Sequence, residues 1–140
     1  MKEKVTKIFK RDPYAKLLNM ELLDWGPGYA KTAVTLTEDM QNFHFTANGG
    51  ILFSLADYAF AVASNSHGQV AVGINTNMSF TAPGHVGERL ICTATEKAKT
   101  RRLAVYQMEI HNDQDELKAR MEGTVYRMNR NFVEEEVENR

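Results

Sequence analysis

Hydrophobic and polar residues alternate over much of the chain, which is the pattern of half-buried β-strands. In residues 29–36 the even-numbered positions form one face of a strand and the odd-numbered positions form the other. Turn-forming residues separate most of these runs, so successive strands are expected to pair in antiparallel fashion. Strands are predicted over residues 20–25, 29–36, 70–80, 89–97, 103–110 and 117–128.

Two short helices are predicted ahead of the strands. Val5, Ile8 and Phe9 have helical spacing within residues 2–10. Asp12-Pro13 is typical of an N-cap followed by proline at the first helical position, which predicts a second helix through about Leu18.

A longer helix is predicted from Gly49-Gly50 to about Asn65. The segment 51–63 is rich in alanine and leucine and is longer than an ordinary strand. Its apolar residues point in every direction around the axis, so the helix should be buried on nearly all sides. The element order predicts an α+β fold in which an antiparallel sheet wraps around this helix. A second copy of the chain would cover what the sheet leaves exposed.

Length and composition predict one globular domain over residues 1–140. The first 18 residues form its helical N-terminal segment, and residues 129–140, which carry several glutamates, form a solvated and frayed acidic tail. A net charge of −1 gives no general attraction for nucleic acid or for anionic membranes. Cys92 is the single cysteine, which fits a reducing compartment and predicts a cytoplasmic protein.

Asp57 lies in the middle of the apolar helix and is the first candidate for chemistry. A buried carboxylate loses several kcal/mol of solvation unless a partner compensates. One reading is structural: the side chain bonds a neighbouring hydroxyl, such as that of Ser54, or a backbone group. The other is catalytic: the carboxylate attacks an electrophilic carbon or activates a water molecule that does so.

Gly49 and Gly50 supply a complementary group at the start of the same helix. A helix N-terminus with free N–H groups can stabilise negative charge on a carbonyl oxygen, although a glycine pair also serves simply as a turn. Asp57 is eight residues beyond Gly49, which places it about 12 Å further along the axis. One carbonyl cannot reach both within one chain. Two chains with antiparallel helices bring Gly49 of one chain to Asp57 of the other, which predicts a site shared across a dimer interface.

The stretch from Asn42 to Ala61 resembles the signature of the PaaI-type (phenylacetate-pathway) hotdog thioesterases. In that signature an asparagine precedes a His-Gly-Gly sequence that opens the helix, and Phe-x-Leu-Ala-Asp follows. The resemblance extends to the strand end 77–83 and the strand start 101–106, and it covers roughly residues 12–128. It implies a hotdog fold and hydrolysis of an acyl-CoA, with an aryl, arylacetyl or medium-chain acyl group, to free acid and CoA.

The resemblance also implies roles for individual polar residues. Asn42 would hold the acyl carbonyl or the attacking water, or else simply cap its loop. Asn48 stands where the family usually has histidine. An amide does not change charge near neutral pH, so we expect Asn48 to orient other groups and not to act in acid–base catalysis. Gly73 stands where related enzymes often have a hydroxyl residue, which leaves Asn75 or Thr76 to position water. Phe80, in the matching strand end, is expected to contact substrate.

Positively charged residues cluster at a predicted hairpin. Arg101 and Arg102, with Lys97 and Lys99, either contact the phosphates of coenzyme A or form a solvated turn. No metal site is expected, because the four histidines show no paired spacing and there is one cysteine. The sequence has no P-loop, Gly-x-Ser-x-Gly or Gly-x-Gly-x-x-Gly motif.

The sequence therefore predicts an acyl-CoA thioesterase without cofactors. It would act as a homodimer at minimum, with a homotetramer expected, and without nucleic-acid or membrane partners. The first alternative is a non-catalytic acyl-CoA-binding hotdog module, which the Asn48 departure leaves open. The second is a hotdog hydratase or dehydratase, although no histidine–carboxylate pair is found on the helix.

Overall fold

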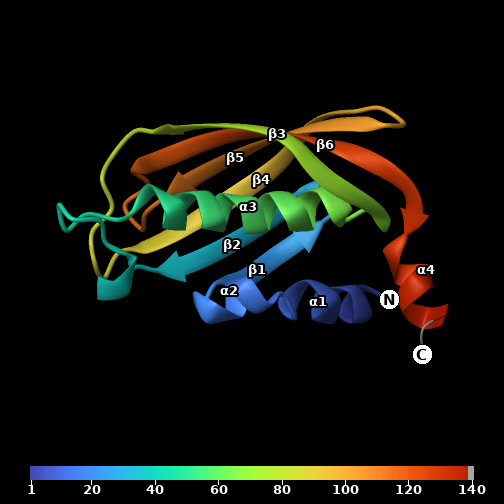
Figure 1. Ribbon diagram of the computed structural model, residues 1–140, viewed down its shortest axis with the longest axis horizontal. Coiled ribbons are helices and arrows are strands. Elements are labelled where there is room, and N and C mark those ends of the chain that lie inside the picture. Colours follow the sequence, from blue (N-terminus) through green and yellow to red (C-terminus); the bar gives the residue numbers. More distant parts are fainter. Residues whose placement is uncertain (139–140) are drawn as a thin grey trace.

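The computed structural model describes residues 1–138 and contains one six-stranded antiparallel sheet that curves around a long helix (Figure 1). The strand order is β1-β2-β4-β5-β6-β3, so β1 and β3 are the two edges. The predicted α+β fold is confirmed. The strands are β1 (Glu21–Gly26), β2 (Tyr29–Thr35), β3 (Gln69–Phe80), β4 (Arg89–Lys99), β5 (Leu103–His111) and β6 (Leu117–Asn131). The helices are α1 (Lys2–Lys10), α2 (Pro13–Leu17), α3 (Gly49–Asn65) and α4 (Phe132–Glu138), with a 3-10 turn at Glu38–Met40.

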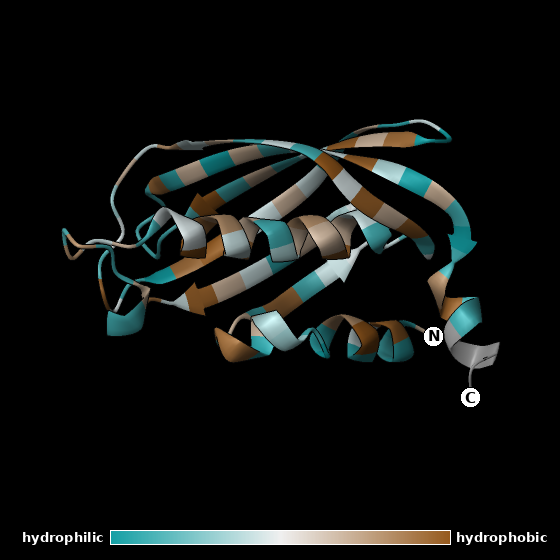
Figure 2. Ribbon diagram, viewed as in Figure 1, coloured by the Kyte–Doolittle hydropathy of each residue, from teal (hydrophilic) through white to brown (hydrophobic). Residues whose placement is uncertain are grey.

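The core lies between α3 and the inner face of the sheet. Alternation along the strands is visible as changing colour in Figure 2, and on β5 the even-numbered residues from Ala104 to Ile110 are the buried ones. On α3, Leu55, Ala56 and Ala59 are fully buried. The small alanines let the helix approach the sheet closely, and burial of the larger side chains provides most of the stabilisation, roughly 1.5–3 kcal/mol for each.

Two glycines make room for one aromatic side chain of this core. A Cβ atom added to Gly123 would lie 2.7 Å from the ring of Phe60, and one added to Gly73 would lie 3.1 Å from it. The Phe60 ring also packs edge-on against Tyr106, with 6.0 Å between ring centroids. Gly73, which stands where related enzymes often carry a hydroxyl, therefore has a packing reason of its own.

Burial of α3 on nearly all sides is not reached within residues 1–138, and the sequence analysis assigned the uncovered part to a second copy of the chain. Gly50, Phe53, Asp57 and Ala61 are exposed and follow one another at spacings of three or four residues, so they form a stripe along the helix. We call these four residues the open stripe. The sheet and the N-terminal helices cover the other directions, whereas this side of α3 is left open by the residues that the structure describes.

The N-terminal helices pack beside the sheet and α3 through aromatic contacts (Figure 1). Phe9 on α1 meets Trp25 edge-on at 5.1 Å between ring centroids, and the Trp25 indole donates a hydrogen bond to Thr6 Oγ1 at 2.8 Å. The Tyr58 hydroxyl of α3 donates to the Phe9 carbonyl at 2.9 Å. The predicted Asp12 cap is present, since its carboxylate accepts from the Ala15 N–H at 3.0 Å.

The C-terminal segment is more regular than the sequence predicted. Instead of a frayed acidic tail from residue 129, β6 continues to Asn131 and α4 follows. Phe132 packs against the hydrophobic core with its ring 6.0 Å from that of Phe9, and the Asn131 side chain accepts from the Val133 N–H at 3.0 Å. Asn139 and Arg140, at the end of the predicted tail, lie outside the described residues. No helix in residues 1–138 has both the length and the apolar character needed to cross a bilayer.

Candidate active site

Asp57 lies on the open stripe of α3 with its side chain exposed in the single chain. Partial loss of solvent raises the pKa of Asp57 above its usual 3.8, and the negative charge of Asp12 raises it further. An ionisable group on an otherwise apolar stripe, with a perturbed pKa, is a candidate for chemistry. Ser54 was the hydroxyl partner suggested for a purely structural Asp57. In the structure the Ser54 hydroxyl instead donates to the Gly50 carbonyl at 2.8 Å and lies 3.2 Å from the Tyr14 hydroxyl.

Gly49 and Gly50 form the first turn of α3, and Asn48 is its N-cap. The Asn48 side-chain oxygen accepts from the Gly50 N–H at 2.8 Å. This is the usual hydrogen bond of an asparagine N-cap. Gly49 lies against Phe80 at the end of β3, because a Cβ atom added to Gly49 would be 3.2 Å from that ring. The structure therefore brings the predicted residues Gly49, Gly50, Asn48 and Phe80 together at one end of α3.

Asn42 caps the loop that precedes α3. Its amide nitrogen donates to Thr46 Oγ1 at 3.0 Å, and its oxygen accepts from the backbone N–H groups of His44 and Thr46 at 2.9 and 3.2 Å. This corresponds to the loop-capping alternative. The loop it closes holds Phe43 and Phe45 out from the surface, 86% and 75% exposed, with Phe45 at a φ of 63°.

Asn75 and Thr76 lie on β3, where every residue from Val72 to Asn77 is exposed. Within residues 1–138, β3 pairs only with β6, so its other edge carries unpaired backbone groups. A register irregularity between Gly73 and Asn75 leaves Ile74, which is 57% exposed, outside the pairing. These polar residues therefore lie on an open sheet edge and not within a closed pocket of one chain.

Arg101 and Arg102 lie in the β4–β5 hairpin, far from the glycines. Leu103 of β5, at the hairpin, pairs with Tyr126 of β6, and Tyr126 pairs with Val72 of β3. The hairpin therefore lies at the same end of the sheet as Val72. Gly49 is next to Phe80, eight residues along β3, which corresponds to about 26 Å. The backbone of the hairpin is fixed by Arg127, whose guanidinium donates to the Thr100 carbonyl at 2.8 Å.

The predicted site residues thus fall into separate groups within one chain. The helix N-terminus lies at the Phe80 end, Asp57 lies in the middle of α3, and the arginines lie at the end where Asn65 bonds to Ala71. An antiparallel partner would place its own Gly49 beside Asp57 and toward the arginine end of the first chain.

Comparison with known proteins places the chain in a family. The model of the thioesterase superfamily matches residues 44–119. The chain belongs to this superfamily.

Similar proteins agree with this assignment. Acyl-coenzyme A thioesterase PaaI of Escherichia coli K12 is 36% identical over 121 residues, which cover 86% of each chain. A putative esterase of Deinococcus radiodurans is 45% identical over 115 residues, which cover 81% of this chain and 78% of the relative. The solved structure of E. coli PaaI, 34% identical, superposes with a TM-score of 0.89 and covers 92% of this chain and 94% of that one. The chain is therefore a PaaI-like thioesterase with the hotdog fold, and it is a thioester hydrolase.

The thioesterase has further residues near Asp57 that sequence reasoning missed. Asp12 is near enough for its charge to act on both Asp57 and Tyr58, and Tyr14 lies at the Ser54 hydroxyl, one turn before Asp57. Tyr14 and Ser54 are forty residues apart in sequence, so no local pattern could have paired them. Among residues 1–138, no group of three His, Cys, Asp or Glu side chains gathers in a way that would hold a metal ion.

Proposed function

We propose that this thioesterase hydrolyses acyl-CoA to a free acid and CoA at a site formed by two subunits. Asp57 comes from one subunit, and the N-terminus of α3, at Gly49 and Gly50, comes from the other. The observation that supports this most is the open stripe, in which Asp57 is the one charged residue among exposed Gly50, Phe53 and Ala61. The proposal extends to a homodimer at minimum, to a homotetramer, and to a cytoplasmic location.

The surface around Asp57 supports a partner that is a second copy. Val72 and Ile74 lie on the edge strand β3, beside the open stripe, and are 44% and 57% exposed. Exposed apolar side chains next to an unpaired strand edge favour association with another chain. Phe53, 38% exposed, is midway between Gly49 and Asp57 in sequence. If a two-fold axis passes near Phe53, each Gly49 is brought opposite the other subunit's Asp57.

The chemistry follows from what the two groups can do to a thioester. The carboxylate of Asp57 either attacks the carbonyl carbon or removes a proton from the attacking water. The carbon–sulfur bond breaks, and the CoA sulfur leaves and takes a proton. If Asp57 attacks directly, the acyl group is first joined to it as an anhydride, which a water molecule then hydrolyses to restore Asp57. In either case the elements of water end on the acid and the thiol. The helix N-terminus carries partial positive charge and stabilises the carbonyl oxygen as negative charge develops on it. Because the Gly50 N–H is donated to the Asn48 side chain, the carbonyl oxygen would meet the Gly49 N–H together with the partial charge of the terminus.

The remaining predicted residues are assigned to the CoA portion and to the walls of the site. Arg101 and Arg102 would meet phosphate groups at the hairpin, since guanidinium groups bind phosphate well. Asn75 and Thr76 would position water or the pantetheine amides from the exposed edge of β3. Phe80 packs on Gly49 and supports the helix terminus, while Asn42 acts by holding the preceding loop in shape.

Release of free CoA, followed with a thiol reagent, tests the proposal. Asp57→Asn keeps the size of the side chain but removes the carboxylate, so kcat should fall by about 100-fold to 10,000-fold. Asp113→Asn makes the same change at an exposed turn residue and serves as the matched control. Full CoA release by the Asp57→Asn protein would refute the assignment. Tight acyl-CoA binding without release by the unaltered protein would instead favour the binding-module alternative.

A further inference from the structure

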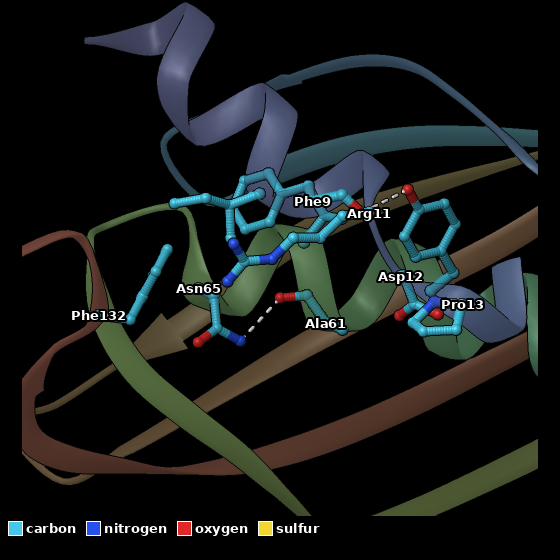
Figure 3. Close-up of a pocket in the computed structure, with 10 residues that line it drawn as sticks. Phe9, Arg11, Asp12, Pro13, Ala61, Asn65 and Phe132 are labelled. Atoms are coloured by element: carbon cyan, nitrogen blue, oxygen red, sulfur yellow. Dashed lines mark hydrogen bonds between the residues drawn. The ribbon is translucent and has the colours of Figure 1, made fainter. Parts of the chain in front are cut away.

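An open cavity of about 510 Å³ lies beside the open stripe, between α1, the connection to α2, the second half of α3 and the start of α4 (Figure 3). Ile8 and Phe9 line it from α1, Tyr58, Ala61 and Val62 line it from α3, and Phe132 lines it from α4. Arg11, Asp12 and Pro13 of the connection also border it. A cavity of this size is in the range of small-molecule sites.

The cavity adjoins Asp57 through Ala61. Ala61 is one helical turn beyond Asp57, belongs to the open stripe and lines the cavity as well. At 100° per residue the two side chains point only about 40° apart around α3. Asp12, which borders the cavity, acts electrostatically on Asp57. A group held at Asp57 can therefore extend directly into the cavity.

The polar groups in the walls are occupied by partners within the protein. The Tyr58 hydroxyl donates to the Phe9 carbonyl at 2.9 Å. The Asn65 amide donates to the Ala61 carbonyl at 2.9 Å, and its oxygen accepts from the Ala71 N–H at 3.0 Å. These groups have little to offer a ligand. The two charged residues of the lining, Arg11 and Asp12, also each have an interaction within the chain. The rest of the lining is mainly aliphatic and aromatic, so the cavity suits an apolar group.

We propose that this cavity binds the acyl group of the substrate, and that Ile8 and Phe132 set the length that it accepts. The inference rests on the proposed function, because the thioester carbonyl must be held at Asp57. In Figure 3 Asp12 and Pro13 lie at one end of the cavity and Phe132 with Asn65 lies at the other. The α3 wall runs from Tyr58 to Asn65, about 10 Å along the axis. A medium-length aliphatic chain or an arylacetyl group fits this span.

The end near Phe132 is closed by contacts between distant parts of the chain. The ring centroids of Phe132 and Phe9 are 6.0 Å apart, so the start of α4 and the end of α1 meet there. The two terminal segments of the chain therefore act as specificity elements. Replacing Phe132 by alanine deepens the cavity, and enlarging Ile8 on the half-buried side of α1 fills it.

The test is the dependence of kcat/KM on acyl length for acetyl-, hexanoyl-, octanoyl-, dodecanoyl- and phenylacetyl-CoA. For Ile8→Trp, the ratio of kcat/KM for octanoyl-CoA to that for acetyl-CoA should fall at least about tenfold. For Phe132→Ala, the preferred length should move toward dodecanoyl-CoA. Leu17→Trp enlarges an apolar residue that is 75% exposed on α2 and does not line the cavity, so it should leave the profile unchanged.

An unchanged length profile in both Ile8→Trp and Phe132→Ala overturns the inference, as does an equal loss on every substrate. Thermal unfolding and size-exclusion chromatography of each variant distinguish a filled cavity from a damaged fold or dimer. Because the two substitutions act in opposite directions, instability of one cannot imitate the expected pair of results. If Asp57→Asn remains active, the proposed function fails. If Asp57→Asn is inactive and the profile does not change, only the cavity assignment fails.

Discussion

At the scale of single residues, the charge on Asp57 depends on its surroundings. Partial desolvation and the nearby Asp12 carboxylate both favour the protonated form, so the pKa of Asp57 lies above 3.8. The proposed reaction requires the carboxylate form of Asp57, and activity should therefore be lost as pH falls through this raised pKa. Asp12 has a second role, as the cap of α2.

Replacing Asp12 by asparagine should move the acid limb of the kcat/KM profile to lower pH. The amide oxygen can still cap α2, because asparagine and aspartate are equally good N-caps. The asparagine side chain is uncharged and does not oppose ionisation of Asp57, so the pKa of Asp57 falls. The profile of kcat/KM against pH measures the shift, and Asp113→Asn is the control. A limb that stays in place would show that Asp12 does not influence the reacting carboxylate.

At the scale of elements, a half-buried polar cluster joins the end of α3 to the sheet. The Tyr106 hydroxyl donates to Glu96 Oε1 at 2.7 Å, and His67 Nε2 lies 2.9 Å from the same oxygen. Burial acts to raise the pKa of Glu96, but the hydrogen bonds from Tyr106 and His67 outweigh it and lower the pKa below 4.5. The cluster fixes strand β4, strand β5 and the loop after α3 relative to one another.

Tyr106→Phe should lower the free energy of unfolding by about 1.5–3 kcal/mol, the usual worth of a hydrogen bond to a charged group. Because the folded-state pKa of Glu96 is depressed, its stabilising contribution is present above about 4.5 and is lost as pH falls through the folded value. The difference in the free energy of unfolding between Tyr106→Phe and the unaltered protein should therefore become smaller at acid pH. Urea denaturation at neutral and acid pH measures both effects, with Tyr126→Phe as an exposed control. Equal stability of variant and unaltered protein at neutral pH would contradict this account.

The helices and strands were largely predictable because their signals are local. Alternation along β2 and β5, the Asp12-Pro13 cap and the Gly49-Gly50 start of α3 each depend on neighbouring residues. The C-terminal segment was not predictable from local signals. Phe132, at the start of α4, packs against α1, and this contact joins opposite ends of the sequence. That the sheet leaves part of α3 exposed was predicted, but which side is exposed was not, since the apolar residues of α3 point in every direction around its axis.

At the scale of the whole molecule, the strand order depends on contacts that the sequence does not reveal. Strand β3 lies at the edge beside β6 and not between β2 and β4, its neighbours in sequence. This position brings Phe80 against Gly49 and leaves the other edge of β3 free. The separation of Gly49 from Asp57 along α3 was predictable from the sequence, whereas the distance of Arg101 and Arg102 from Gly49 emerged only from the fold.

The shared site can be tested directly by mixing two inactive variants. Asp57→Asn removes the carboxylate. Gly50→Asp suits a helix N-terminus but places negative charge where the carbonyl oxygen must become negative. If each site combines Asp57 of one subunit with Gly50 of the other, every mixed dimer contains one intact site. Random exchange makes about half of the dimers mixed, so about a quarter of the unaltered activity should return. Mixed dimers that form, as shown by mass spectrometry of differently tagged chains, but release no CoA would contradict the account.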